Sequence, residues 1–336
     1  MMQFYYILLF LATSFCACNS ITKAEETTTT YTTNLDRSVL SDTAIEQDSN
    51  LPESQQPTTL NKDDKYTSFD RTSIEANLKA KVANKQPLVV HLFVPLCDNE
   101  HQGIVPTTAS LGNGFSLRSN LYWATTNGVK RYFKEKKHWK LLQSIKNVYK
   151  DSVVLERVIF RRTYPNQATV YIIADAYRGD KMLATLNHFS RAMSNNYSKK
   201  ITLPDSSRID IHGGADLVVF NGHNGFLDFA EDIPTKFYNT TNSKKDMVAI
   251  ACFANEYFER EALRAQAYPI VRAKSTLHPG AFIVSAIIDD WAMLQPVEEM
   301  RLSAGSAYCN IHNCSVQTSK NLFYKGWCPE NLDSSF

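Results

Sequence analysis

The sequence predicts an α/β fold, in which a mostly parallel sheet carries helices on both faces and forms three layers. Short, nearly continuous apolar runs rich in β-branched and aromatic residues recur along the chain, as is typical of strands buried on both faces. Segments with a helical period lie between them, and this alternation is typical of doubly wound sheets. The chain has 336 residues, of which 43% are hydrophobic, which excludes collagen-like, disulfide-dense and wholly disordered proteins.

Residues 1–18 have the pattern of an export signal. They carry no charge, and the apolar run at 4–12 is shorter than the roughly 20 residues that span a membrane. Ala17-Cys18 resembles the lipobox of bacterial lipoproteins, which implies cleavage before Cys18 and lipidation of its sulfur. A lipidated Cys18 would attach the protein to a membrane of the bacterial envelope. Phe15 before Cys16, and the lack of Lys or Arg before the run, depart from that pattern, so ordinary cleavage and free secretion remain the alternative.

Residues 19–70 are expected to form a disordered, acidic tether. The segment is rich in Thr, Ser, Asp, Gln, Pro and Asn and shows no period, so it has too little apolar surface to offset the entropy of ordering. It holds 10 acidic and 4 basic residues, which leaves 32 basic and 24 acidic residues in 71–336. We expect 71–336 to form a single α/β domain. No basic run interleaved with aromatic residues occurs, so nucleic acid is not an expected partner.

The predicted strands are the apolar runs themselves. The first ends at Pro95, and another is expected to form a hairpin through the turn at 164–166. In chain order the expected strands are residues 88–94, 153–160, 169–174, 217–220 and 247–251.

The predicted helices lie between the strands and after the last one. The longest, 121–149, places aromatic and aliphatic side chains on one face and lysines on the other. Asp180 is expected to cap the next helix. Further helices are expected at 255–267, 281–294 and 298–308.

A long loop at 97–120 follows the carboxyl end of the first strand. It is rich in Gly and Asn and has no period, and long loops at such positions are typical of functional sites. Cys97, Asp98 and His101 in this loop, with Asp175 at the expected end of strand 169–174, are predicted to contact substrate.

Two neighbouring strand ends carry the residues best suited to chemistry. His223 follows the strand at 217–220, and Cys252 follows the strand at 247–251. If these strands are parallel neighbours, both side chains emerge at one edge of the sheet, as a nucleophile and its base require. Imidazole beside a thiol favours the thiolate and supplies a proton to the leaving group. Backbone N–H groups of Asn224, Gly225 and Cys252 are candidates to hold the oxyanion.

This layout resembles the caspase–gingipain–legumain superfamily of cysteine peptidases over residues 88–270. The superfamily has a His-Gly after one apolar strand and an Ala-Cys after the next; Ala251-Cys252 matches, whereas Asn224 separates His223 from Gly225. The resemblance implies a caspase-like sheet, a peptide or protein substrate, a His223–Cys252 dyad and no cofactor. The departure at Asn224 puts the oxyanion N–H after the histidine in doubt. The body also resembles uncharacterised bacterial secreted proteins and lipoproteins, which implies no activity.

Three alternatives stay open. Cys97, His101, His223 and Cys252 are zinc-ligand types, although they come from scattered loops. A Cys97–Cys252 disulfide would remove the nucleophile. A third possibility is a non-catalytic surface lipoprotein that binds a ligand or partner through the 97–120 loop.

The C-terminal cysteines suggest a disulfide. Cys309 and Cys314 close a small loop and are the first choice for pairing, and Cys309 with Cys328 is the second.

Overall fold

The computed structural model describes residues 68–149, 151–229, 237–239 and 241–328. All of them belong to one compact unit, Gln56–Phe336. The expected export signal at 1–18, its Cys18, and the expected tether up to residue 67 lie outside the described residues. Within the described residues, no helix combines the length and apolar character needed to cross a membrane.

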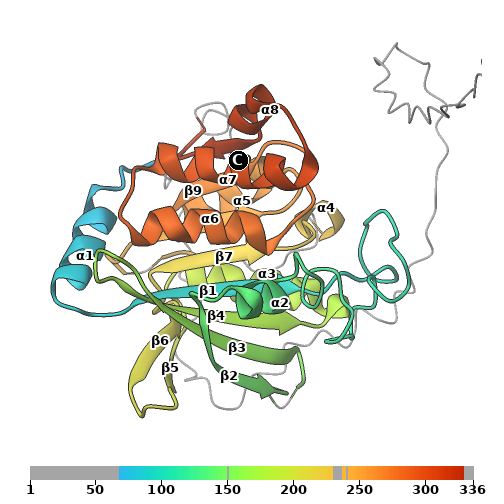
Figure 1. Ribbon diagram of the computed structural model, residues 1–336, viewed down its shortest axis with the longest axis horizontal. Helices are drawn as coiled ribbons and strands as arrows, with labels where there is room; N and C mark the ends of the chain where they lie inside the picture. Colours follow the sequence, from blue (N-terminus) through green and yellow to red (C-terminus); the bar gives the residue numbers. More distant parts are fainter. Residues whose placement is uncertain (1–67, 150, 230–236, 240, 329–336) are drawn as a thin grey trace, which may run out of the picture. The chain divides into compact units, whose positions relative to one another are not determined.

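A mixed sheet of eight strands lies at the centre of the unit, in the order β10-β9-β8-β7-β1-β4-β3-β2 (Figure 1). Its central part is parallel and contains β4 (Thr169–Tyr177), β1 (Leu88–Pro95), β7 (Leu217–Asn221), β8 (Lys245–Ile250) and β9 (Ala267–Ala273). Antiparallel strands complete both sides, namely β3 (Val154–Thr163) and β2 (Lys140–Lys146) beside β4, and β10 (Phe323–Lys325) beside β9. The predicted α/β fold with a mostly parallel sheet is confirmed, as is the hairpin of β3 with β4.

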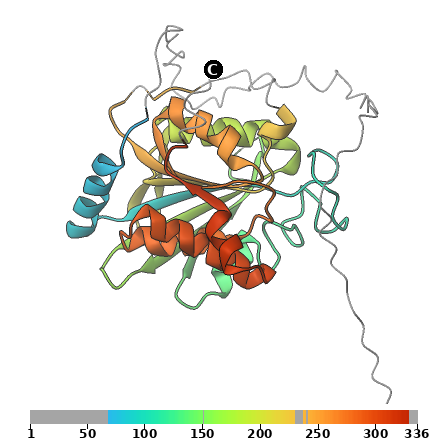
Figure 2. The ribbon, with the colours of Figure 1, turned by 90° about the horizontal axis from the view of Figure 1, so that it is seen from above.

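Helices cover both faces of the sheet (Figure 2). One face carries α3 (Met182–Met193) and α5 (Ala254–Ala265), which contact each other. The opposite face carries α2 (Val129–Glu135), α6 (Ala281–Ala292) and α7 (Val297–His312). A separate hairpin of β5 (Ser198–Thr202) and β6 (Arg208–His212) packs through β6 against α3 and β1. The remaining helices are α1 (Thr72–Ala83), α4 (Phe226–Phe229) and α8 (Val316–Asn321), with a 3-10 turn at Gly179–Lys181.

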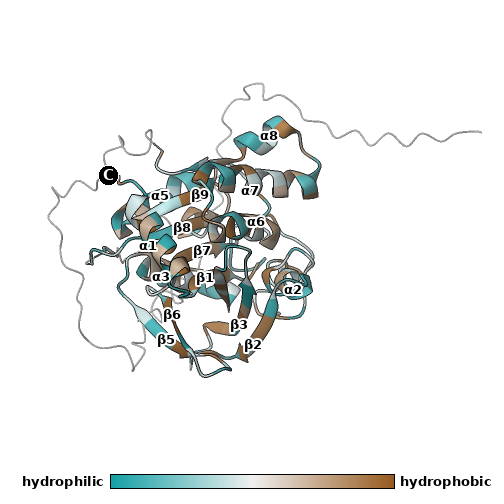
Figure 3. Ribbon diagram, turned by 60° about the vertical axis from the view of Figure 1, so that its left-hand side comes forward, coloured by the Kyte–Doolittle hydropathy of each residue, from teal (hydrophilic) through white to brown (hydrophobic). Residues whose placement is uncertain are grey.

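The core lies in and around the central strands. Every residue of β1, β7 and β8 is buried, because each strand has a neighbour on both sides and helices above and below. This double burial explains why most of their residues are apolar. Hydrophobic colouring runs through several strands of the sheet, β2 and β3 included (Figure 3), although the edge strand β2 is largely exposed or half-buried.

The predicted helix at 121–149 is wrong. Only Val129–Glu135 is helical, and Lys140–Lys146 forms edge strand β2, which pairs with β3. The apolar residues that suggested one helical face belong to separate parts of the chain: Phe133 is buried in α2, Trp139 is buried just before β2, and Leu142 is half-buried in β2. Pairing with β3 therefore overrides the local helical pattern, since strand formation depends strongly on tertiary context.

Two further corrections concern helix and strand boundaries. α3 begins at Met182 after Lys181, with no side-chain cap, and Asp180 instead binds Arg178. Strand β9 is absent from the predicted strands. Its Pro269, which lacks an N–H and disfavours a central strand, lies where the register between β8 and β9 shifts.

Candidate active site

The pairing of β7 with β8 brings the loops that carry His223 and Cys252 together at one edge of the sheet. The two strands are parallel, and Asn221 at the end of β7 pairs with Ile250 at the end of β8. Counting two residues further along both strands matches His223 with Cys252. Both residues lie beyond the ends of their strands, and the pairing brings the two loops that carry them to the same carboxyl edge of the sheet.

Asn224 ties the two strand ends together. Its side chain is fully buried, and its Nδ2 donates a hydrogen bond of 2.7 Å to the carbonyl oxygen of Cys252. Its Oδ1 accepts from the N–H of Phe226 at 3.1 Å, which holds the first turn of α4. The residue that interrupts the His-Gly motif thus links the histidine loop to the cysteine.

Cys252 lies on a sharp turn between β8 and α5. The next residue, Phe253, has a left-handed backbone with φ of 50°, which is uncommon for a side chain of this size. The N–H of Phe253 donates to Ser275, and the sulfur of Cys252 lies 3.3 Å from both the N and the O of Leu277. The loop after β9 therefore forms one wall around the thiol. The N-terminus of α5 lies beside it and favours negative charge.

His223 is oriented by an acid that the sequence did not single out. The imidazole is buried, and Nε2 lies 2.8 Å from Oδ2 of Asp228 in α4. The same oxygen accepts the N–H of Gly103 at 3.2 Å, so the 97–120 loop touches the histidine site. The only available signal was an aspartate five residues after the histidine, which is too common to be informative. Among the described residues, no hydrogen bond joins His223 to the sulfur of Cys252.

The loop at 97–120 contains no helix or strand, as expected, but side chains brace it from within. The fully buried Asn120 accepts the N–H of Cys97 at 3.1 Å and donates to its carbonyl at 2.8 Å. Gln102 donates to the carbonyls of Leu96 at 2.8 Å and Gly179 at 3.1 Å. The loop is thus anchored to the ends of β1 and β4 at the same edge as α4 (Figures 1 and 2).

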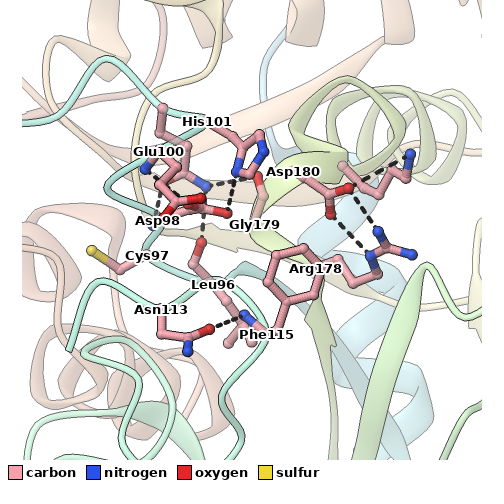
Figure 4. Close-up of polar contacts among 12 residues, drawn as sticks. Leu96, Cys97, Asp98, Glu100, His101, Asn113, Phe115, Arg178, Gly179 and Asp180 are labelled. Carbon is pink, nitrogen blue, oxygen red and sulfur yellow. Dashed lines mark hydrogen bonds and ion pairs between the residues drawn. The ribbon is translucent and has the colours of Figure 1, made fainter. Parts of the chain in front are cut away.

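The residues expected to contact substrate differ in accessibility. Asp98 exposes 3% of its side chain and binds His101 at 3.0 Å, whereas His101 exposes 44%. Beside them Arg178 lies over the ring of Phe115, at 5.0 Å from its centroid, and binds Asp180 (Figure 4). Of the loop residues predicted to contact substrate, only His101 is accessible in this arrangement.

Cys97 is a buried thiol with a raised pKa in this fold. It is 1% exposed, and its sulfur points away from Asp98 and His101 (Figure 4). Burial raises the pKa of the Cys97 thiol to about 11, although a hydrogen bond with Tyr122 opposes the shift. A thiol that stays protonated near neutral pH is a poor nucleophile. Cys97 therefore has almost no exposed surface with which to contact substrate in this arrangement.

Asp175 does not end its strand and does not reach the edge. It lies two residues before the end of β4 and is fully buried. Its carboxylate accepts two hydrogen bonds of 2.6 Å from Arg157 and lies 3.0 Å from Nε2 of His91. Burial acts to raise the pKa of Asp175, but Arg157 and His91 outweigh it and hold that pKa well below its usual range. The predicted substrate contact is replaced by an internal ion pair.

Histidines extend this internal network under α3. The backbone N–H of His212 donates to the ring Nδ1 of His91 at 2.9 Å. The ring Nε2 of His212 lies 2.9 Å from the hydroxyl of Tyr149. Burial lowers the pKa of His91, and it lowers that of His212 well below the usual value. Burial also lowers the pKa of the nearby His188 to about 4. These histidines are neutral structural groups, and none contacts Cys252 within the described residues.

The structure also bears on the zinc site and on the disulfide pairings that the sequence suggested. In the part of the chain that is described, no group of three or more His, Cys, Asp and Glu side chains is arranged to hold a metal ion. Cys97 and Cys252 are both free thiols, so no disulfide joins them. Cys309 and Cys314 form a disulfide at the end of α7, which is the first of the two pairings considered.

The arrangement can support attack by a thiol on a carbonyl, with an imidazole held at the neighbouring strand end. The N–H groups of Cys252, Asn224 and Gly225 lie at these two ends and make no hydrogen bond within the described residues. Comparisons with protein-family models, with curated proteins and with solved structures found no match to this chain.

Proposed function

We propose that this protein is a cysteine peptidase or amide hydrolase of the bacterial envelope, with Cys252 as nucleophile and His223 as acid and base. One observation carries the proposal: His223 and Cys252 follow the carboxyl ends of two parallel neighbouring strands, and Asn224 bonds their two loops. This is the arrangement that the caspase–gingipain–legumain resemblance implies. A caspase-like sheet is part of the same proposal, supported by the parallel order of β1, β7, β8 and β9.

The chemistry follows from the positions of the groups. The thiol proton passes to His223, and the sulfur forms a bond to the carbonyl carbon of the substrate while the carbonyl oxygen takes the negative charge. The N–H of Cys252, with one at Asn224 or Gly225, stabilises that oxyanion. The C–N bond then breaks as His223 returns the proton to the leaving amine. Water hydrolyses the thioester and restores the thiol, so the cycle requires no cofactor.

The sulfur must turn from Leu277 toward His223 when substrate binds. In the present arrangement it contacts the N and O of Leu277 at 3.3 Å. Catalytic hydrogen bonds are often long or misaligned before substrate binds and tighten in the complex.

Alkylation and kinetics test the proposal. We expect iodoacetamide to modify Cys252 at neutral pH, and we expect Cys252→Ala and His223→Gln to abolish cleavage of a peptide library. If Cys252 is unreactive and Cys252→Ala changes no measurable cleavage, the proposal is wrong.

A non-catalytic binding lipoprotein is the second candidate. The 97–120 loop exposes 92% of Val105 and 48% of Phe115, and exposed apolar side chains are typical of interaction surfaces. For this candidate, Val105→Ser and Phe115→Ser would remove partner binding, whereas Cys252→Ala would not.

A further inference from the structure

His223 has a single hydrogen-bond partner among the described residues, and that partner is a carboxylate. Oδ2 of Asp228 lies 2.8 Å from Nε2. An ionised carboxylate can only accept a hydrogen bond, so the neutral imidazole carries its proton on Nε2. Nδ1 then presents a free lone pair, and it makes no hydrogen bond within the described part of the chain.

The carboxylate of Asp228 is itself held in place from two directions. The backbone N–H of Asp228 donates to the carbonyl oxygen of Gly225 at 3.1 Å, which fixes the turn of α4 that carries the carboxylate. Its Oδ2 also accepts the N–H of Gly103 at 3.2 Å. A Cβ added at Gly103 would overlap Oδ1 of Asp228, so the loop approaches the acid as closely as a glycine allows.

The pair is shielded enough for its geometry to matter. The side chain of His223 is 7% exposed and that of Asp228 is 16% exposed. Ion pairs on an open surface contribute little, whereas a bond of this length in a largely desolvated position holds an imidazole in one orientation and one tautomer.

We propose that Asp228, locked by the N–H of Gly103, is the positioning residue that makes Nδ1 the reactive nitrogen of His223. This inference rests on the proposed function. The thiol proton moves from the sulfur of Cys252 to Nδ1, and the resulting imidazolium donates through Nε2 to Asp228. The proton later leaves Nδ1 for the amine of the substrate. Asp228 remains ionised throughout and never contacts the substrate.

The tautomer is the direct test. The 15N chemical shifts of the ring nitrogens, measured on the full-length protein at pH 8 and assigned with His223→Gln, report which nitrogen carries the proton. We expect Nε2–H for His223 in the wild type and a shift toward Nδ1–H in Asp228→Asn, because the amide can donate to Nε2. A wild-type His223 with its proton on Nδ1 overturns the inference without any variant.

Reactivity of Cys252 is the second test, and it requires no known substrate. We compare the rate of alkylation of Cys252 by iodoacetamide between pH 5 and 9, followed by mass spectrometry of its peptide. We expect His223→Gln to slow the reaction at pH 7 on the order of tenfold, since an adjacent imidazolium favours the thiolate. We expect Asp228→Asn to show part of that loss, together with an altered pH profile.

Two matched variants separate positioning from a general loss of charge. Gly103→Ala retains every ionisable group but displaces the carboxylate, and we expect it to reproduce the effect of Asp228→Asn on both readouts. Asp180→Asn removes an acid of nearly equal exposure, 15%, that binds Arg178 instead of a histidine, and we expect wild-type behaviour. If Asp228→Asn fails to fold, Gly103→Ala and the wild-type tautomer decide the question.

The outcomes distinguish this inference from the proposed function. If His223→Gln alkylates as fast as the wild type, the dyad itself is wrong. If His223→Gln is slow while Asp228→Asn and Gly103→Ala keep the wild-type tautomer and rate, the dyad stands and the role of Asp228 is overturned.

Discussion

Replacing His212 by glutamine should flatten the dependence of the free energy of unfolding on pH between pH 6.5 and pH 5. Burial lowers the pKa of His212 well below its usual value, whereas in the unfolded chain a histidine titrates near 6.5. Below about pH 6.5 the unfolded chain therefore binds a proton that the folded protein does not, and stability falls as the pH falls. Glutamine keeps an acceptor for Tyr149 but binds no proton.

The size of the effect follows from counting protons. One histidine that protonates only on unfolding changes the free energy of unfolding by up to about 1.4 kcal/mol per pH unit. Burial also lowers the pKa of His188, to about 4, so His188 and His212 together give a slope of up to about 2.7 kcal/mol per pH unit. Removing His212 should reduce the slope by about 0.7 kcal/mol per pH unit at pH 6.5, rising to about 1.3 kcal/mol per pH unit at pH 5. Asp175 does not contribute to the slope between pH 6.5 and 5, because the stability that its ionised form provides is lost only below about pH 4.

Urea unfolding at half-unit intervals of pH measures this slope, whatever the overall loss of stability in the variant. Between pH 7.5 and 8.5 the histidines are neutral in both states, so the curves of the two proteins should run parallel there and serve as the internal control. Equal slopes for wild type and His212→Gln between pH 6.5 and 5 would show that His212 is protonated in the fold, and the reasoning on the buried network would be refuted.

Four other predictions follow from single features. Cys97 should resist iodoacetamide at pH 8 in the folded protein and react only in urea, because burial raises its pKa to about 11; modification at the rate of a free thiol would contradict this. Asn224→Ala should lower the free energy of unfolding by about 1–3 kcal/mol, since the carbonyl of Cys252 loses its donor; an unchanged urea midpoint would argue against that link. Burial lowers the pKa of Lys245 to about 7, so stability should rise by up to about 1.4 kcal/mol per pH unit above pH 7, and Lys245→Met should remove that rise. Cys18→Ser should abolish incorporation of labelled fatty acid in a bacterial host, whereas retained label would exclude Cys18 as the acylated residue.

Local patterns were sufficient for the buried strands. β1, β4, β7 and β8 were predicted because a strand covered on both faces needs apolar, β-branched residues at nearly every position, and that requirement is visible in the sequence. The helix at 121–149 failed for the opposite reason. Its apolar residues serve a short helix and an edge strand in turn, and only the pairing of β2 with β3 separates them.

The candidate site was predicted in part. The positions of His223 and Cys252 after two apolar strands were visible, and the structure makes those strands parallel neighbours. The partners of the two residues were not visible: Asp228 faces the imidazole and Leu277 faces the sulfur. A carboxylate or a backbone amide has no sequence pattern that indicates which side chain it will meet.

By itself the sequence determined which segments must be buried and which reactive side chains follow them, because burial and strand periodicity act over a few residues. The tertiary structure decided that β1 lies between β4 and β7, that Asp175 points into the interior, and that Gly103 meets Asp228 across 125 positions of the chain. Contacts between residues so far apart depend on how strands order themselves in the sheet, and no local propensity specifies that order.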